Sequence, residues 1–213
     1  NNGIQFMKTV MELHIQNHLD ANNGYVNALR QMISGMETLD QGQRIMYDYF
    51  DCNFASTNMT PRKPTFKVEW DIAYNEDYAY AINTALYIQK EIGIPISATF
   101  NNTTVPPTQS NLDTLIRNFK PLYDAGVKTV TIPHTHWMAT GQIKKAFPEI
   151  HVKNTILRDV STPSEIVNLA KAGFDYINLD RDLMRNRDVL LRLLEAKVWI
   201  KKNLGKDIKY SLL

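Results

Sequence analysis

Residues that can move protons or bind anions cluster just after two short apolar segments of the sequence. His134 and His136 follow one of these segments, and Asp180, Arg181 and Asp182 follow the other. Imidazole and carboxylate groups can act as general acids or bases, and a guanidinium group can bind a carboxylate or phosphate through parallel hydrogen bonds. We therefore predict that His134 and Asp182 are catalytic, proton-transferring residues and that Arg181 binds substrate.

Three more polar side chains occupy equivalent positions along the chain. Asn101, Asn154 and Arg158 each lie at or just beyond the end of a predicted strand. Because the carboxyl ends of parallel strands meet at one edge of a sheet, ligands of α/β proteins bind there. We predict that these three residues bind substrate at a polar, mildly cationic opening.

Metal binding and structural bracing are the alternative roles for these residues. If the strand before His134 continued, His134 and His136 would point to the same side, and Asp180 or Asp182 on a later strand would complete a ligand set, Asp180 being the first choice. We assign no metal site, because we favour a structural explanation in which one histidine hydrogen-bonds a neighbouring loop and the other is solvated. Arg181 has a structural alternative too, as a brace that forms ion pairs between adjacent strands.

Repeated helix-to-strand units must position these side chains. Helical patterns end at Gly93, Gly126, Gly173 and Gly205, and each glycine is followed by a short β-branched segment. The sequence predicts six strands, over Thr65–Tyr74, Ile94–Phe100, Val127–Pro133, His151–Leu157, Tyr176–Leu179 and from near Asp207 to the carboxyl terminus. Strands separated by helices imply parallel pairing through right-handed crossovers.

The segments between the strands have helical periodicity. The predicted helices span Glu76–Ile92, Ser110–Gly126, Met138–Ala146, Thr162–Ala172 and Asp188–Leu204. The fourth begins with a capping box, in which the side chains of a threonine and of a glutamate three residues later each accept a hydrogen bond from the other's backbone N–H. A proline occupies the first helical position. Such a start is a strong local signal for a helix.

The predicted fold class is α/β, a TIM-type (β/α) barrel that is incomplete, with an N-terminal helical segment. No glycine-rich fingerprint follows a strand, which argues against a nucleotide-binding doubly wound sheet. A barrel needs eight strands, so another subunit or a missing C-terminal segment is expected to close it.

Two modules are predicted, a helical N-terminal segment over residues 1–60 and a partial barrel over residues 65–213. Apolar spacing in the first module predicts helices over Ile4–Leu19, Tyr25–Ile33 and Gln43–Phe50, with no strand. A polar connector with two prolines separates this module from the barrel.

The composition is that of an ordinary globular protein, with 213 residues of which 44% are hydrophobic and 22% are charged. A formal net charge of +2 gives no electrostatic reason to expect a nucleic-acid partner. No apolar run has the roughly 18 residues needed to span a bilayer, so no membrane partner is expected. The single cysteine, Cys52, cannot form an internal disulfide, and we expect a cytoplasmic protein.

Short motifs at the strand ends also match a known pattern. Phe100-Asn101 and Asn154-Thr155 each lie in a predicted strand end, and residues 179–183 read Leu-Asp-Arg-Asp-Leu. They resemble the Leu-Asn pair, the Thr-Gln-like group and the Leu-x-Arg-Glu-Leu-like motif of the peptidase U32 family, with aspartate in place of glutamate in the last. The resemblance covers roughly residues 94–213.

This resemblance implies a (β/α) barrel and, for function, a hydrolase or an oxygen-independent hydroxylase with a small-molecule or peptide substrate. Several family members bind an iron–sulfur cluster through cysteines that lie beyond the sixth strand. We therefore expect no cofactor in this segment, and an iron–sulfur cluster only if the natural chain continues with cysteines. The alternative is a non-catalytic binding or assembly module on a degenerate barrel.

Overall fold

The computed structural model describes residues 13–15, 50–52, 90, 96–100, 103–155 and 158–211. The described strands belong to one parallel sheet, and they are β1 (Leu13–Ile15), β2 (Phe50–Cys52), β3 (Ile96–Thr99), β4 (Thr129–Ile132), β5 (His151–Asn154), β6 (Tyr176–Asn178) and β7 (Lys209–Ser211). The α/β class and the parallel pairing predicted from the sequence are thereby confirmed.

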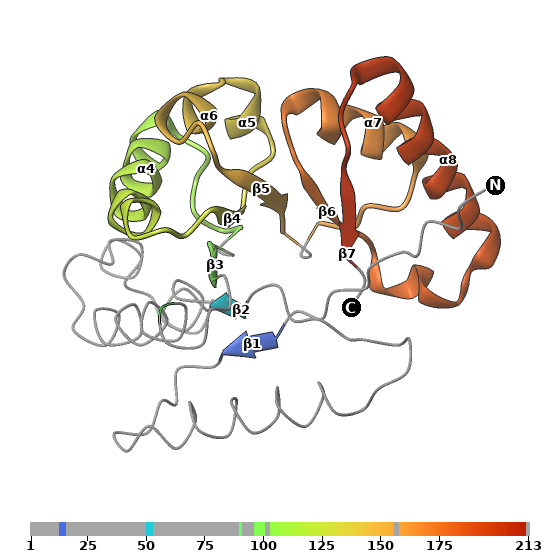
Figure 1. Cartoon of the computed structure of the whole chain (residues 1–213), viewed down its shortest axis with the longest axis horizontal. Coiled ribbons are helices and arrows are strands. Elements are labelled where there is room, and N and C mark those ends of the chain that lie inside the picture. The colour runs from blue at the N-terminus through green and yellow to red at the C-terminus, as the bar shows by residue number, and fades with distance from the viewer. Residues whose placement is uncertain are drawn as a thin grey trace.

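The strands lie side by side in the order of the chain, from β1 to β7. A doubly wound sheet would instead reverse its strand order at a switch point. Figure 1 shows the strands following one another around an arc, with the described helices on its outer side. This singly wound order places the carboxyl ends of successive strands next to one another.

Two strands lie within the first sixty residues, where the sequence predicts helices and no strand. β1 falls inside the predicted helix Ile4–Leu19, and β2 begins at the last residue of the predicted helix Gln43–Phe50. Segments of three residues are too short for their apolar spacing to distinguish a helix from a strand. Here the parallel pairing of β1 with β2 and of β2 with β3 decides their conformation. The predicted strand Thr65–Tyr74 and the module boundary lie outside the described residues.

The described helices are α4 (Gln109–Asp124), α5 (His136–Ala139), α6 (Gln142–Ala146), α7 (Pro163–Ala172), α8 (Arg187–Leu204) and a 3-10 helix, η2 (Arg181–Arg185). One half of the predicted capping box is confirmed, because the Thr162 hydroxyl oxygen accepts a hydrogen bond from the backbone N–H of Glu165 at 3.3 Å. The Glu165 carboxylate accepts from the Thr162 hydroxyl at 2.7 Å and not from its backbone. None of these helices has the length and apolarity that crossing a membrane requires.

The single helix predicted over Met138–Ala146 is in fact two short helices, α5 and α6. Gly141 separates them with a φ of 72°, in the left-handed region where a residue with a Cβ atom is strained. No heavy atom lies within 4 Å of the position that a Cβ on Gly141 would occupy, so the backbone conformation and not crowding calls for glycine.

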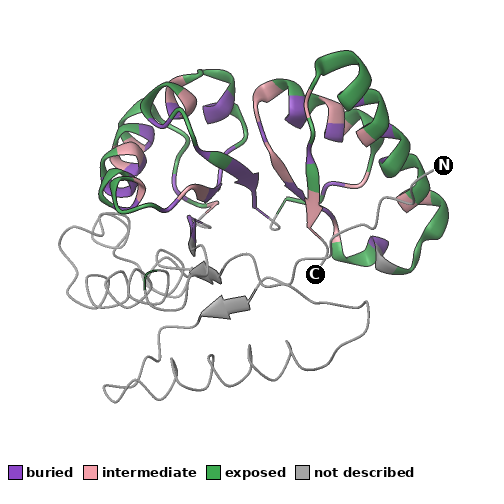
Figure 2. Ribbon diagram, viewed as in Figure 1, coloured by how far each residue is buried: buried purple, intermediate pink, exposed green. Residues whose placement is uncertain are grey.

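The hydrophobic core lies on one face of the sheet. Ala98, Val130 and Val152 alternate with polar residues along β3, β4 and β5, and they belong to the same buried cluster as Leu115 and Phe119 of α4. Successive side chains of a strand point to opposite faces, so the polar residues of these strands point away from that core. Figure 2 shows that the helices are exposed on their outer sides and buried toward the strands.

Candidate functional site

The candidate site lies at the carboxyl ends of β4, β5 and β6. His134 follows β4 by two residues, Asn154 is the last residue of β5, and Arg158 comes four residues later. Asp180 follows β6 and is the N-cap of η2. Neighbouring strands thus contribute predicted site residues at adjacent positions. Asn101, which was predicted to bind substrate, lies outside the described residues.

His134 is a buried imidazole with a defined hydrogen bond. Its side chain is 4% exposed, and its Nε2 atom lies 2.5 Å from the carbonyl oxygen of Val105. Because a carbonyl oxygen only accepts hydrogen bonds, this contact requires the proton on Nε2. The neutral ring then carries its lone pair on Nδ1, which is the nitrogen that can take up a proton. The indole of Trp137 packs edge-on, with ring centroids 4.9 Å apart.

The pKa of His134 is lowered from 6.5, chiefly by burial. The hydrogen bond to Val105 opposes this change, whereas the positive charge of Arg158 and the nearby His136 lower the pKa further. His134 is therefore neutral at pH 7, which is the state that a general base needs. The same interaction shows that the structure brings Arg158 into electrostatic range of His134.

His136 lies at the first position of α5, and β4 ends at Ile132. The strand therefore does not continue through the two histidines, because the chain turns from strand to helix between them, and the condition under which they would point to the same side is not met. The His136 Nε2 atom lies 3.3 Å from the carbonyl oxygen of Pro107, and the ring centroids of His134 and His136 are 5.9 Å apart. Both histidines thus contact the loop that leads into α4.

No cluster of three or more potential metal ligands occurs among the described residues. His134, His136 and Asp180 accordingly do not form such a cluster in the structure. A single cysteine, Cys52, cannot supply the thiolates of an iron–sulfur cluster, so a cluster bound by cysteines beyond these residues stays a prediction.

Asn154 and Asn178 join β5 to β6 through their side chains. The Asn154 Oδ1 atom accepts a hydrogen bond from the backbone N–H of Asn178 at 2.7 Å, and its Nδ2 atom donates to the Asn178 carbonyl at 3.2 Å. The Nδ2 atom of Asn178 donates to the Asn154 carbonyl at 2.6 Å. These amides replace backbone pairing at the end of the strands. Substrate binding by Asn154 stays a prediction.

The charged cluster after β6 forms the start of η2. The Asp180 Oδ1 atom accepts a hydrogen bond from the backbone N–H of Asp182 at 2.9 Å, which caps the helix. The backbone N–H of Asp180 donates to the carbonyl of Val160 at 3.0 Å, and this bond ties the cluster to the segment after β5. Arg181 and Asp182 are exposed on η2. Their predicted roles in binding and proton transfer stay predictions.

Two groups that form hydrogen bonds in this arrangement were not predicted from the sequence. The carbonyl of Val105 fixes the proton on His134, and no side-chain pattern can indicate a backbone acceptor 29 residues away. Asn178 was missed although it carries the same signal as Asn154, an asparagine at the end of a buried strand.

The chain resembles solved structures in its fold, at low sequence identity. No protein-family model and no curated protein sequence matches the chain. The structure of a U32 peptidase superposes with a TM-score of 0.52 and 16% sequence identity, over 76% of this chain and 61% of that one. A member of the enolase superfamily from Enterococcus faecalis superposes with a TM-score of 0.49 and 12% identity, over 95% of this chain and 42% of the other.

The likeness to the U32 peptidase shows a shared fold and supports a barrel-like arrangement of strands and helices. The superposition spans about three fifths of the length of that peptidase, since 61% of it is covered. The fold predicted from the strand-end motifs is thereby supported, at an identity that says nothing about the reaction.

Proposed function

We propose that this chain is a barrel domain of U32-peptidase type that binds a peptide or small-molecule substrate at the carboxyl ends of its strands and hydrolyses it. The observation that carries the proposal is His134, a buried and neutral imidazole at the end of β4 with its proton held on Nε2. A histidine in this state is prepared to accept a proton, and the carboxyl ends of parallel strands are where α/β proteins bind their ligands.

In this proposal His134 accepts a proton on Nδ1 from a water molecule as the water attacks the peptide carbonyl. The proton then passes to the leaving amine, so that one water and one amide give a carboxylic acid and an amine. Arg158 and Arg181 bind anionic groups of the substrate, because a guanidinium matches a carboxylate in shape and charge. Asp182, exposed on η2, is the second proton-transferring residue.

The sequential parallel strand order also supports closure of the sheet into a barrel, as in the U32 family that the sequence resembles. Polar residues on the face away from the helices are buried, as expected of a sheet that curls around that face. Closure would bring the ends of β1 and β7, the first and last strands of the order, toward each other.

Hydrolysis can be tested with a mixed peptide library whose products are identified by mass spectrometry. We expect the full chain to cleave members of the library and His134→Gln to lose most of this activity. His151→Gln is the matched control, because His151 is an exposed histidine at the opposite end of β5. Cleavage that is equally fast in both variants would contradict the assignment of His134, and absence of cleavage by the unaltered protein would contradict hydrolysis.

A non-catalytic binding module is the second candidate function, and specific contacts favour it. Asn154 and Asp180, both predicted site residues, use their side chains in structural hydrogen bonds at strand and helix ends. A module of this kind would bind peptides from the same library without cleaving them. Retention of peptides on the immobilised protein, with unchanged masses, would decide for binding over hydrolysis.

A further inference from the structure

A row of polar side chains crosses the sheet on the face opposite the hydrophobic core. Thr99 of β3 pairs in register with Thr131 of β4, and Thr131 pairs with Lys153 of β5. Residues in register on neighbouring parallel strands lie side by side on one face. Ser97 lies on the same face, two residues before Thr99 along β3. The row is thus continuous across three strands.

All four side chains are buried, with exposed fractions of 0% for Ser97, 6% for Thr99, 2% for Thr131 and 1% for Lys153. Lysine is almost never buried to this extent unless its charge is compensated, because removing an ammonium group from water is costly. The interior positions of known barrels are filled mostly by valine, isoleucine and leucine. Packing alone therefore does not explain a lysine and three hydroxyl groups on this face.

Two of the hydroxyl groups have unused hydrogen-bonding capacity. The Oγ atom of Ser97 and the Oγ1 atom of Thr131 are buried and make no hydrogen bond. A buried hydroxyl in this state lowers stability relative to an apolar group of the same shape. Such groups in native proteins are accounted for by a bound water, a bound ion or a functional role. Thr131 lies beside Lys153 in register, and Ser97 lies on the same face of the adjacent strand β3, so three potential donors are gathered on this face of the sheet.

We propose that Ser97, Thr131 and Lys153 bind an oxyanionic group of a small ligand, either a carboxylate or a phosphate. Hydroxyl groups donate to anionic oxygens, and an ammonium group has three donors, so that Lys153 can keep a protein acceptor and bind the ligand as well.

Thr131 and Lys153 are the penultimate residues of β4 and β5, so the site lies just inside the carboxyl edge of the sheet. A ligand that enters from this edge meets them first. The proposal does not rest on hydrolysis, because anion binding requires no turnover.

Isothermal titration calorimetry of the full chain with sodium phosphate, and separately with sodium acetate, tests the site when sodium chloride holds the ionic strength constant. Thr131→Val and Ser97→Ala each remove one hydroxyl group with little change in volume, and each should raise the dissociation constant about two- to tenfold. Lys153→Met should raise it about ten- to a hundredfold, since a charged donor is lost. The probe that binds more tightly identifies the class of oxyanion.

A stability measurement without ligand separates a binding role from a structural one. Thr131→Val should melt at a temperature equal to or above that of the unaltered protein, because the substitution removes an unsatisfied buried hydroxyl. We therefore expect Thr131→Val to bind the anion more weakly without any loss of stability. Thr114→Val is the matched control, because the Thr114 hydroxyl already donates a hydrogen bond to the Ser110 carbonyl on α4. The affinity of this variant for the anion should be unchanged.

The proposal is overturned if neither phosphate nor acetate binds the unaltered protein. It is equally overturned if Thr131→Val and Ser97→Ala bind as tightly as Thr114→Val, since the anion would then be held elsewhere, as by the exposed arginines. A crystal structure grown in phosphate that shows one ordered water bridging the two hydroxyl groups, and no anion, would assign them a purely structural partner.

Discussion

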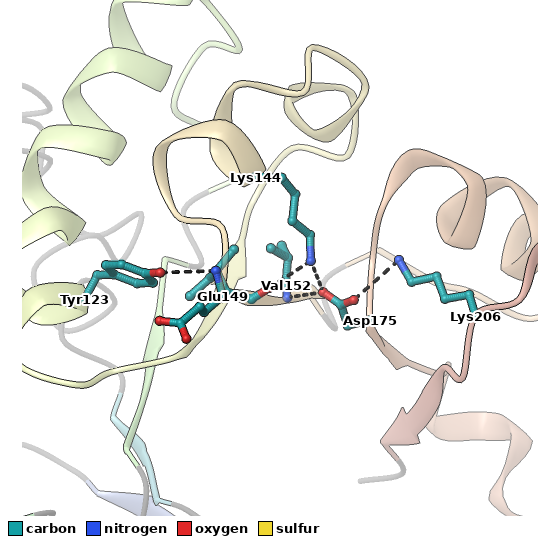
Figure 3. A network of polar contacts seen from close by, with 7 residues as sticks. Tyr123, Lys144, Glu149, Val152, Asp175 and Lys206 are labelled. Carbon is teal, nitrogen blue, oxygen red and sulfur yellow. Dashed lines mark hydrogen bonds and ion pairs between the residues drawn. The ribbon is translucent and has the colours of Figure 1, made fainter.

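The two ends of the parallel sheet are built on different principles. At the amino ends of β5 and β6, the carboxylate of Asp175 contacts Lys144 at 2.5 Å and Lys206 at 3.4 Å, and it accepts a hydrogen bond from the backbone N–H of Val152 at 2.8 Å (Figure 3). At the carboxyl ends, His134 keeps a lone pair on Nδ1. One carboxylate therefore braces one end of the sheet, while the other end retains groups that can act on a ligand.

The contrast indicates that residues at opposite ends of the strands serve stability and function separately. Asp175 connects α6, β5 and the segment before β7, because Lys144 and Lys206 come from elements that are distant in sequence. Burial lowers the pKa of Lys206, and the neighbouring Asp175 opposes that change. In β/α folds, residues at the amino ends of the strands serve stability and residues at the carboxyl ends serve catalysis.

Asp175→Ala should have the largest effect on stability, a loss of about 2–4 kcal/mol, because it leaves Lys144 and Lys206 without their shared carboxylate. Peptide binding at the carboxyl ends should not change. Urea denaturation measures the first quantity and library retention the second. Asp124→Ala is the control, since Asp124 makes only an exposed ion pair with Lys120 and should cost less than about 0.5 kcal/mol. Equal stability of the two variants would refute the bracing role of Asp175.

Asn154→Ala should lower stability by about 1–3 kcal/mol, because it removes two hydrogen bonds to Asn178 and leaves buried polar groups unsatisfied. Urea denaturation with Asn203→Ala as the control provides the measurement, since the Asn203 side chain bonds only an exposed carbonyl of α8. If peptide affinity falls while stability is kept, Asn154 belongs to the binding site and the brace interpretation fails.

Acidification should lower the stability of the fold through protonation of His134. We expect this loss of stability to be smaller than the one caused by Asn154→Ala. Because burial lowers the folded-state pKa of His134, the unfolded chain takes up a proton first as the pH falls below 6.5. The stability from this group is complete above pH 6.5 and is lost as the pH falls through the folded-state pKa. His134→Gln, which can still donate to Val105, should flatten the pH dependence of the urea midpoint, and His151→Gln should not. An unchanged dependence in His134→Gln would refute this assignment.

Arg158→Met should have the smallest effect, a rise in the pKa of His134, because the positive charge of Arg158 is one of the influences that lower it. Titration of the imidazole signals by NMR follows this pKa directly. Arg192→Met, an exposed substitution on α8, is the control and should leave the His134 titration unchanged. A His134 pKa that is identical in all three proteins would show that Arg158 does not act on the site.

Most elements from residue 94 onward could be predicted from the sequence because local chemistry fixes them. The capping residues Thr162 and Glu165 start α7 where expected, and Gly173 ends it with a φ of 113°. The short strands β1 and β2 could not be predicted, because three residues contain too little periodicity and their conformation depends on pairing with distant strands. The break at Gly141 was missed because an isolated glycine inside a helical pattern is ambiguous.

The candidate site was predictable in position and not in its contacts. Strand ends are local features, so the sequence could place His134, Asn154 and Arg158 near one edge of the sheet. The partner of Asn154 lies 24 residues away, and Lys153 looks like any charged residue in a short strand until its burial is known. A side chain's partners depend on how separate strands meet, and that information is not local.

By itself, the sequence determined the helix-to-strand repeat and the residues that end each strand, because turns, caps and alternation act over a few neighbouring residues. Only the tertiary structure decided that the strands follow one another in chain order, that the proton of His134 is held by Val105 and that Lys153 lies buried beside the unsatisfied hydroxyl group of Thr131. These outcomes arise from long-range packing, in which burial and pairing are shared among strands that are distant in the chain.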